Sequence, residues 1–287
     1  MPRWNLIVLL LLLGTAFASP AKSAKSKVVQ RALRESVRVE VLVGGKVARA
    51  ASGVVVALEG MNSYVLTNAH VVERKGLAGA ATFEVVVERP LLHRLRARVV
   101  AEGHVPDDDL ALLEISGEPL AAAAIASADQ IEVGDDVVVI GAPYGRSLSV
   151  SSGIVSQLEI AEGEGQRGMK TDAPIGYGAS GGGVFEVPSG RLVGLVEGYR
   201  TAKVNFGGIS NDDFSFDVPM PGETFLAPPT KIRAFLVRAG IGRLAGIRDG
   251  TVKDQSGNMP STLPVAQRNA LPRNAPRRFR SARAPSL

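Results

Sequence analysis

Short runs rich in Val, Ile and Leu recur along most of the chain, separated by Gly, Pro, Asn and Asp. Examples are SVRVEVLVGG, SGVVVALEG, SYVLTNAHVV, TFEVVVER, DLALLEI, DVVVIGAP and RLVGLVEG. Many closely spaced strands of this kind indicate a β-sandwich or barrel rather than alternating βαβ units. The stretch GEPLAAAAIASADQIEVG has fewer strand formers and indicates a boundary near residues 120–132. We therefore expect an all-β fold with units at about 35–120 and 132–228.

The pattern changes at both ends of this β region. TKIRAFLVRAGI has apolar residues at spacings i, i+3, i+4 and i+7, which predicts an amphipathic helix at 230–240. The folded domain, residues 35–243, should end just after it. Residues 244–287 are rich in Pro, Arg and Ala with few core formers, which predicts a disordered tail. Residues 19–34 form a polar lead-in with a short helix in VVQRALRE.

The first residues, MPRWNLIVLLLLLGTAFASP, combine a basic start, a short apolar run and an A-x-A site. This pattern predicts a signal peptide at 1–18 and hence a secreted or periplasmic protein, with an uncleaved anchor as the alternative. The chain has no cysteine, which excludes disulfides, thiolate chemistry and cysteine-based zinc sites.

The formal charge of +5 is concentrated in the tail. Residues 261–287 hold six arginines and no acid, so the rest of the chain carries a net charge of −1. The tail could contact nucleic acid, anionic lipid or cell-wall polymer through charge alone. It contains few aromatic residues, so sequence-specific nucleic-acid binding is not expected.

One glycine-rich stretch, TDAPIGYGASGGG, surrounds the single serine Ser180. GASGG fits the G-x-S-x-G elbow of α/β-hydrolases, but that fold needs a histidine after the serine. The only histidines, His70, His93 and His104, all precede Ser180. The order His70, Asp109, Ser180 is instead the order found on double β-barrels.

Three blocks then make a resemblance specific. SGVVV…YVLTNAHVV, DDDLALLEI and TDAPIGYGASGGGVF…GRLVGLVEG resemble the catalytic blocks of trypsin-like serine peptidases, closest to the bacterial high-temperature-requirement type. The resemblance covers roughly residues 35–240 and implies two six-stranded, chymotrypsin-like β-barrels with a C-terminal helix. It also implies no cofactor and no metal. Too few residues follow 243 for the PDZ module that usually follows this domain.

The resemblance assigns a role to each matching position. His70 would be the general base, Asp109 the acid that orients it and Ser180 the nucleophile. The N–H groups of Gly178 and Ser180 would form the oxyanion hole. The primary substrate pocket would be formed by five residues: Pro174, Ile175, Val196, Glu197 and Tyr199.

Some positions depart from the family's usual pattern. Ala179 precedes the serine where the bacterial branch has asparagine, so the loop could be more mobile before substrate binds. The pocket base offers no carboxylate, which predicts cleavage after small or aliphatic residues rather than after Lys or Arg. GEGQRGMKT resembles a phosphate-binding loop only superficially, because its lysine spacing is wrong. His93 and His104 are expected on the surface.

The sequence thus predicts a serine endopeptidase acting on proteins or peptides through a covalent acyl-enzyme. The alternative is a catalytically weak or inactive module of the same fold that binds peptides or anionic surfaces. The sequence gives no indication of the oligomeric state.

Overall fold

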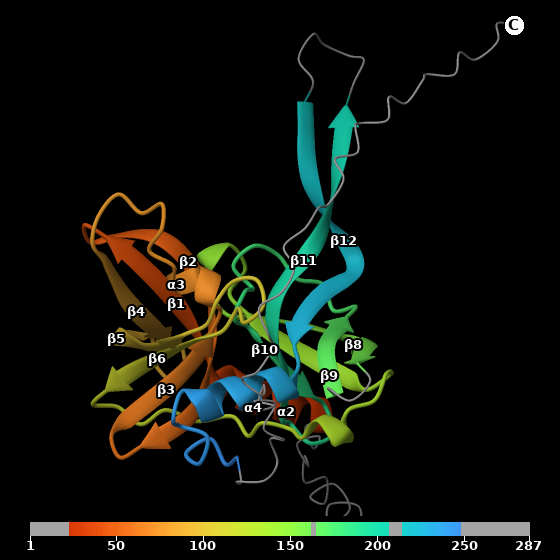
Figure 1. Ribbon diagram of the computed structural model, residues 1–287, viewed down its shortest axis with the longest axis horizontal. Helices are drawn as coiled ribbons and strands as arrows, with labels where there is room; N and C mark the ends of the chain where they lie inside the picture. The colour runs from red at the N-terminus through yellow and green to blue at the C-terminus, as the bar shows by residue number, and fades with distance from the viewer. Residues whose placement is uncertain (1–22, 162–164, 207–213, 248–287) are drawn as a thin grey trace, which may run out of the picture. The chain divides into compact units, whose positions relative to one another are not determined.

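The fold consists of two closed β-barrels of six strands each (Figure 1). The computed structural model describes residues 23–161, 165–206 and 214–247. The expected all-β, two-barrel architecture with a C-terminal helix is confirmed. The expected signal peptide, the start of the lead-in segment and nearly all of the tail lie outside the described residues.

The first barrel closes in the strand order β1-β2-β3-β6-β5-β4. Alternation of side chains along each strand explains its interior: Val37, Val39 and Val41 of β1 are all buried while Arg38 between them forms ion pairs. Its strands are β1 (Ser36–Val43), β2 (Lys46–Glu59), β3 (Asn62–Thr67), β4 (Ala81–Val87), β5 (His93–Glu102) and β6 (Ala111–Ser116). The short helix α3 (Ala69–Val72) follows β3 directly.

The second barrel closes in the order β10-β11-β12-β9-β8-β7. Its strands are β7 (Asp136–Gly141), β8 (Ser149–Ala161), β9 (Gly165–Thr171), β10 (Gly183–Glu186), β11 (Leu192–Phe206) and β12 (Phe214–Ala227). β9 corresponds to the segment that resembles a phosphate-binding loop, and β12 lies inside the expected second unit at 132–228 but outside the strand-like runs quoted above. The 3₁₀ turns η1 (Ala128–Gln130) and η2 (Pro143–Gly145) precede β7 and β8 respectively.

The strands β11 and β12 extend beyond the barrel as a two-stranded ribbon (Figure 1). Residues 201–206 pair with residues 214–219, whereas only residues 224–226 of β12 also pair with β9. The inner part of the ribbon therefore belongs to the barrel wall. In its outer part, among the described residues, β11 and β12 pair only with each other.

Two helices cover the junction of the barrels. α2 (Ala24–Glu35) begins at Ser23, whose hydroxyl accepts from the Ser26 N–H, and α4 (Pro229–Arg238) begins with a proline at its first turn. One apolar cluster contains residues of both barrels and both helices, among them Leu33, Leu66, Leu112, Ile140, Phe185, Leu195, Ile232 and Leu236. Each barrel also has its own interior cluster. No helix within the described ranges is long and apolar enough to cross a bilayer.

Candidate active site

His70 lies on the single turn of α3, at the end of strand β3. Arg49 of the neighbouring β2 donates to the carbonyl oxygens of His70 and Val71, at 2.7 and 2.8 Å. The last carbonyls of a helix have no partner within the helix, so this guanidinium satisfies them and fixes the turn. The backbone that carries the imidazole is therefore anchored to the barrel wall.

Asp109 orients the imidazole through two contacts. Its Oδ2 lies 2.6 Å from His70 Nδ1, and its Oδ1 accepts the backbone N–H of His70 at 2.9 Å. The Asn68 side chain in turn donates to the Asp109 carbonyl oxygen at 2.8 Å. A carboxylate only accepts, so Nδ1 carries the proton and Nε2 of the neutral ring is left as an acceptor. This is the state that a general base requires.

Ser180 lies on the loop between β9 and β10, which contacts the first barrel. The Ser52 N–H donates to the Ser180 carbonyl oxygen at 2.8 Å. A Cβ on Gly181 would lie 2.5 Å from Thr67 Oγ1, so only glycine permits this approach to the end of β3. The serine is thereby placed beside the strand that leads to His70. Within the described ranges no hydrogen bond joins the Ser180 hydroxyl to His70, a bond that often tightens only when substrate is bound.

Backbone hydrogen bonds hold several peptide groups around Ser180. Tyr177 O accepts from Tyr144 N–H at 2.5 Å, Ala179 N–H donates to Gly176 O at 3.0 Å, and Gly182 N–H donates to Ala179 O at 2.8 Å. The N–H groups of Gly178 and Ser180 have no acceptor in the described part of the chain. Two free donors on one turn are the arrangement that a developing oxyanion needs.

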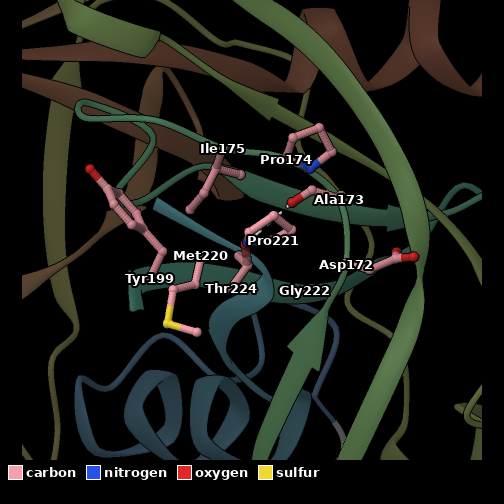
Figure 2. Close-up of a pocket in the computed structure, with 9 residues that line it drawn as sticks. All are labelled: Asp172, Ala173, Pro174, Ile175, Tyr199, Met220, Pro221, Gly222 and Thr224. Atoms are coloured by element: carbon pink, nitrogen blue, oxygen red, sulfur yellow. Dashed lines mark hydrogen bonds between the residues drawn. The ribbon is translucent and has the colours of Figure 1, made fainter. Parts of the chain in front are cut away.

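A pocket of about 340 Å³ lies beside this loop (Figure 2). Its wall comes from the segment before Ser180 and from β11 and β12. The lining residues are Asp172, Ala173, Pro174, Ile175, Tyr199, Met220, Pro221, Gly222 and Thr224. Thr224 donates to the Ala173 carbonyl oxygen at 3.2 Å, which joins β12 to the pocket base.

Three of the five residues expected in the substrate pocket, Pro174, Ile175 and Tyr199, do line it. The other two do not: Val196 is buried in the core of the second barrel, and the Glu197 carboxylate lies 2.5 Å from Lys231 Nζ of α4. Burial raises the pKa of Glu197, against the effect of Lys231.

The structure adds a carboxylate that sequence reasoning left out. Asp172 is among the lining residues, beside Pro174 and Ile175, which were expected to form an apolar base. Its Oδ1 accepts the Ile154 N–H at 2.7 Å, and in Figure 2 its carboxylate points away from Tyr199 and Met220. The sequence analysis assigned no β12 residue to the pocket, because it took the wall from β11 alone.

The rings of Tyr144, Tyr177 and Tyr199 form a row that begins at η2 and ends at the pocket. The ring centroids of Tyr144 and Tyr177 are 6.4 Å apart, and those of Tyr177 and Tyr199 are 5.7 Å apart and edge-on. Burial raises the pKa of Tyr199 to about 12, so its phenol is neutral at any ordinary pH. Tyr199 therefore presents an uncharged aromatic side chain to the pocket.

The remaining histidines take no part in this site. His93 Nε2 contacts Glu118 at 2.9 Å, and His104 is exposed. In the part of the chain that the structure describes, no cluster of His, Asp and Glu could hold a metal ion.

Comparison with known proteins supplies relatives for this arrangement. The chain is 33% identical over 171 residues to a "Probable periplasmic serine endoprotease DegP-like" of Ectopseudomonas mendocina, covering 59% of this chain and 32% of that protein. It is 33% identical over 164 residues to the "Magnetosome formation protease MamE" of Paramagnetospirillum magneticum, covering 55% of this chain and 21% of that protein. The chain thus spans about a third or less of the length of these curated relatives.

A solved structure supports the fold alone. The serine endoprotease from Yersinia pestis superposes with a TM-score of 0.58 at 23% identity, over 76% of this chain and 66% of that one. The family model described as "Trypsin-like peptidase domain" matches residues 51–195, about half of the chain, including His70, Asp109 and Ser180. The chain belongs to the trypsin-like peptidase domain family.

Proposed function

We propose that the protein is a serine endopeptidase that cleaves proteins or peptides through a triad of His70, Asp109 and Ser180. The observation that carries the proposal is the 2.6 Å contact between His70 Nδ1 and Asp109 Oδ2, on a strand end that the Ser180 loop directly contacts. The printed names of the relatives, one a serine endoprotease and the other a protease, agree with it.

The chemistry follows from the protonation state of the ring. Ser180 Oγ attacks the substrate carbonyl carbon while its proton passes to His70 Nε2, and Asp109 stabilises the imidazolium. The tetrahedral oxyanion accepts from the N–H groups of Gly178 and Ser180. The imidazolium then protonates the leaving amine, and an acyl-enzyme remains. Water, deprotonated by the same imidazole, hydrolyses that ester and restores the serine.

The pocket proposed for the side chain before the scissile bond is mostly apolar. Ile175, Tyr199 and Met220 face it in Figure 2, and the carboxylate of Asp172 points away from them. A buried cation would have no ready partner there, so we infer a preference for small or aliphatic residues. We place the reaction in the periplasm or outside the cell, in line with the leader sequence and the printed names of the relatives.

Labelling with a fluorophosphonate tests the proposal. The wild type should be labelled and should cleave casein, and Ser180→Ala should lose both, because the probe bonds to the activated Oγ. The exposed Ser189 provides a control, and Ser189→Ala should keep both activities. Labelling that persists in Ser180→Ala would contradict the assignment of Ser180 as the nucleophile. Preferred cleavage after Lys or Arg would contradict the proposed preference for small or aliphatic residues.

A second candidate function rests on the missing bond between Ser180 and His70. A protein in which that bond never forms would hold a peptide in the same cleft without cleaving it. Absence of labelling in the wild type, together with measurable binding of an extended peptide, would favour this module over the enzyme.

A further inference from the structure

Ser52 is a residue of the first barrel whose contacts lie largely in the second. It sits on β2, is fully buried, and its own carbonyl oxygen accepts from Thr67 Oγ1 at 2.8 Å. Buried polar groups need hydrogen-bond partners. The Ser52 hydroxyl finds both of its partners in loops of the second barrel, 90 and 126 residues away in the sequence.

The Ser52 hydroxyl donates one hydrogen bond and accepts another. Ser52 Oγ donates to the Gly178 carbonyl oxygen at 2.7 Å and accepts the Ala142 N–H at 2.9 Å. The Ser52 backbone N–H adds the 2.8 Å bond to the Ser180 carbonyl oxygen. One residue therefore holds the carbonyl groups of both residues whose N–H groups face the proposed oxyanion site.

The geometry of the peptide unit shows what these bonds control. Each peptide is planar, so the two peptides that flank Gly178 rotate relative to each other only through its φ and ψ. Gly178 has a φ of +88°, and glycine gives little intrinsic resistance to rotation. Tyr144 N–H holds the preceding peptide and Ser52 Oγ holds the following one. The Gly178 N–H lies in the preceding peptide, and the two bonds together limit the rotation of that peptide relative to the one that follows Gly178.

We propose that Ser52 is a positioning residue, which fixes the oxyanion loop from the opposite barrel. The inference rests on the proposed serine peptidase function. Ser52 does not touch substrate; it keeps the Gly178 and Ser180 N–H groups aimed at the same point before substrate arrives. These bonds also compensate for the absence of an asparagine side chain at Ala179, because they hold the loop from the first barrel rather than from a residue of the loop itself.

Replacement of the hydroxyl should affect the transition state more than substrate binding. Ser52→Ala leaves the Gly178 carbonyl oxygen and the Ala142 N–H without their partner, so the peptide between Gly178 and Ala179 keeps only the bond from Ala179 N–H to Gly176 O. Loss of a whole oxyanion donor costs roughly 10²–10³ in kcat, and misalignment of one should cost about tenfold or more. KM should change by less than about threefold, because the pocket residues are untouched.

Ser63 provides a matched control in the same barrel. It is also fully buried, donates to the Glu118 carbonyl oxygen at 2.8 Å and accepts the Leu120 N–H at 2.9 Å. Ser63→Ala therefore removes the same two kinds of hydrogen bond from a buried serine. The partners of Ser63, at Glu118 and Leu120, do not belong to the loop that carries Ser180. A purely structural role for Ser52 predicts that the two variants behave alike.

The experiment compares wild type, Ser52→Ala and Ser63→Ala by the second-order rate of fluorophosphonate labelling, by kcat and KM on one peptide, and by thermal unfolding. Slower labelling and lower kcat in Ser52→Ala alone support the inference. A Ser52→Ala variant that folds and reacts at the wild-type rate overturns it, as does equal slowing of both variants. If Ser52→Ala does not fold, Ser52→Cys keeps a side chain of the same shape, slightly larger, with a much weaker donor, and its full activity would overturn the inference. Failure of the wild type to react contradicts the proposed function itself, and removes the basis for a role of Ser52.

Discussion

Gly181 and Gly222 have the same backbone φ of +78° in very different surroundings. A Cβ on Gly181 would lie 2.2 Å from the Ser52 carbonyl oxygen, whereas a Cβ on Gly222 would meet nothing within 4 Å. The first glycine is therefore needed both for its backbone conformation and for the close approach of two barrels. The second is needed for its conformation only.

Alanine at these two positions should separate the two effects. Gly222→Ala should lower the free energy of unfolding by about 1–2 kcal/mol, the cost of a left-handed conformation for a residue with a Cβ. Gly181→Ala should cost the same amount and about 1–3 kcal/mol more, because the methyl group overlaps β2. Urea unfolding of both variants measures the difference. Equal destabilisation would show that the loop can move away from Ser52.

At the same scale, residues whose role depends on a contiguous motif could be predicted from the sequence. Asp109 is the aspartate that directly precedes the Leu-Ala pair in DDDLALLEI, and the structure pairs it with His70. Ser52 could not be found this way, because its partners at Ala142 and Gly178 are remote in the chain. Nothing local distinguishes it from any other small residue before a run of valines.

At the scale of elements, α2 ends on a buried carboxylate. Glu35 Oε1 accepts from Arg31 Nε at 2.7 Å, while Glu35 Oε2 is buried and, within the described residues, has no partner. Burial raises the pKa of Glu35 above its ordinary value of 4.5, although Arg31 acts to lower it. The helix therefore carries a group that folds more favourably when protonated.

This shift predicts how stability depends on pH. The folded state binds the Glu35 proton more tightly than the unfolded state, so unfolding releases a proton between the two pKa values. Stability from this group is complete below pH 4.5 and falls as the pH rises through the raised value. The free energy of unfolding of wild type relative to Glu35→Gln should therefore decrease from pH 4 to pH 7 in urea titrations. An increase over that range would contradict the assignment.

Strands β9 and β12 show why part of the second barrel was not predicted. β9, GQRGMKT, has two glycines and a single large apolar residue, Met169, and β12 contains Pro219, Pro221 and Gly222. β9 lacks the alternation of apolar and polar residues that identifies a strand, whereas β12 shows it in FSFDV before the prolines interrupt the pattern. Their pairing is supplied by neighbours, since residues 224–226 of β12 pair with residues 169–171 of β9. Such strands depend on the barrel that already surrounds them.

The whole molecule is held together across the barrel junction. Besides the shared apolar cluster, Glu88 at the end of β4 bonds Arg38 at 3.0 Å and accepts the Leu148 N–H of the second barrel at 2.9 Å. Arg38 also donates to the Arg146 carbonyl oxygen. The proposed site uses side chains from both barrels, so its geometry depends on this junction as much as on either barrel.

The junction predicts that the two barrels unfold together. Phe185 of β10 is fully buried in the apolar cluster that also contains Leu66 and Leu112 of the first barrel. Phe185→Ala removes a large side chain from that shared interior and should cost about 3–5 kcal/mol of stability.

Hydrogen exchange measures this coupling, through the most protected amides of β3 and β6 on one side and of β7 and β11 on the other. In a cooperative molecule all of them exchange through global unfolding, so their free energies of opening should fall by the same amount in Phe185→Ala. Val139→Ala is the comparison for Phe185→Ala. Val139 lies in the apolar cluster of the second barrel alone, so this variant removes apolar contacts without changing the cluster that both barrels share. Protection lost only from the second barrel in Phe185→Ala would mean that the barrels are independent units, and that the alignment of His70 with Ser180 is set by substrate rather than by the fold.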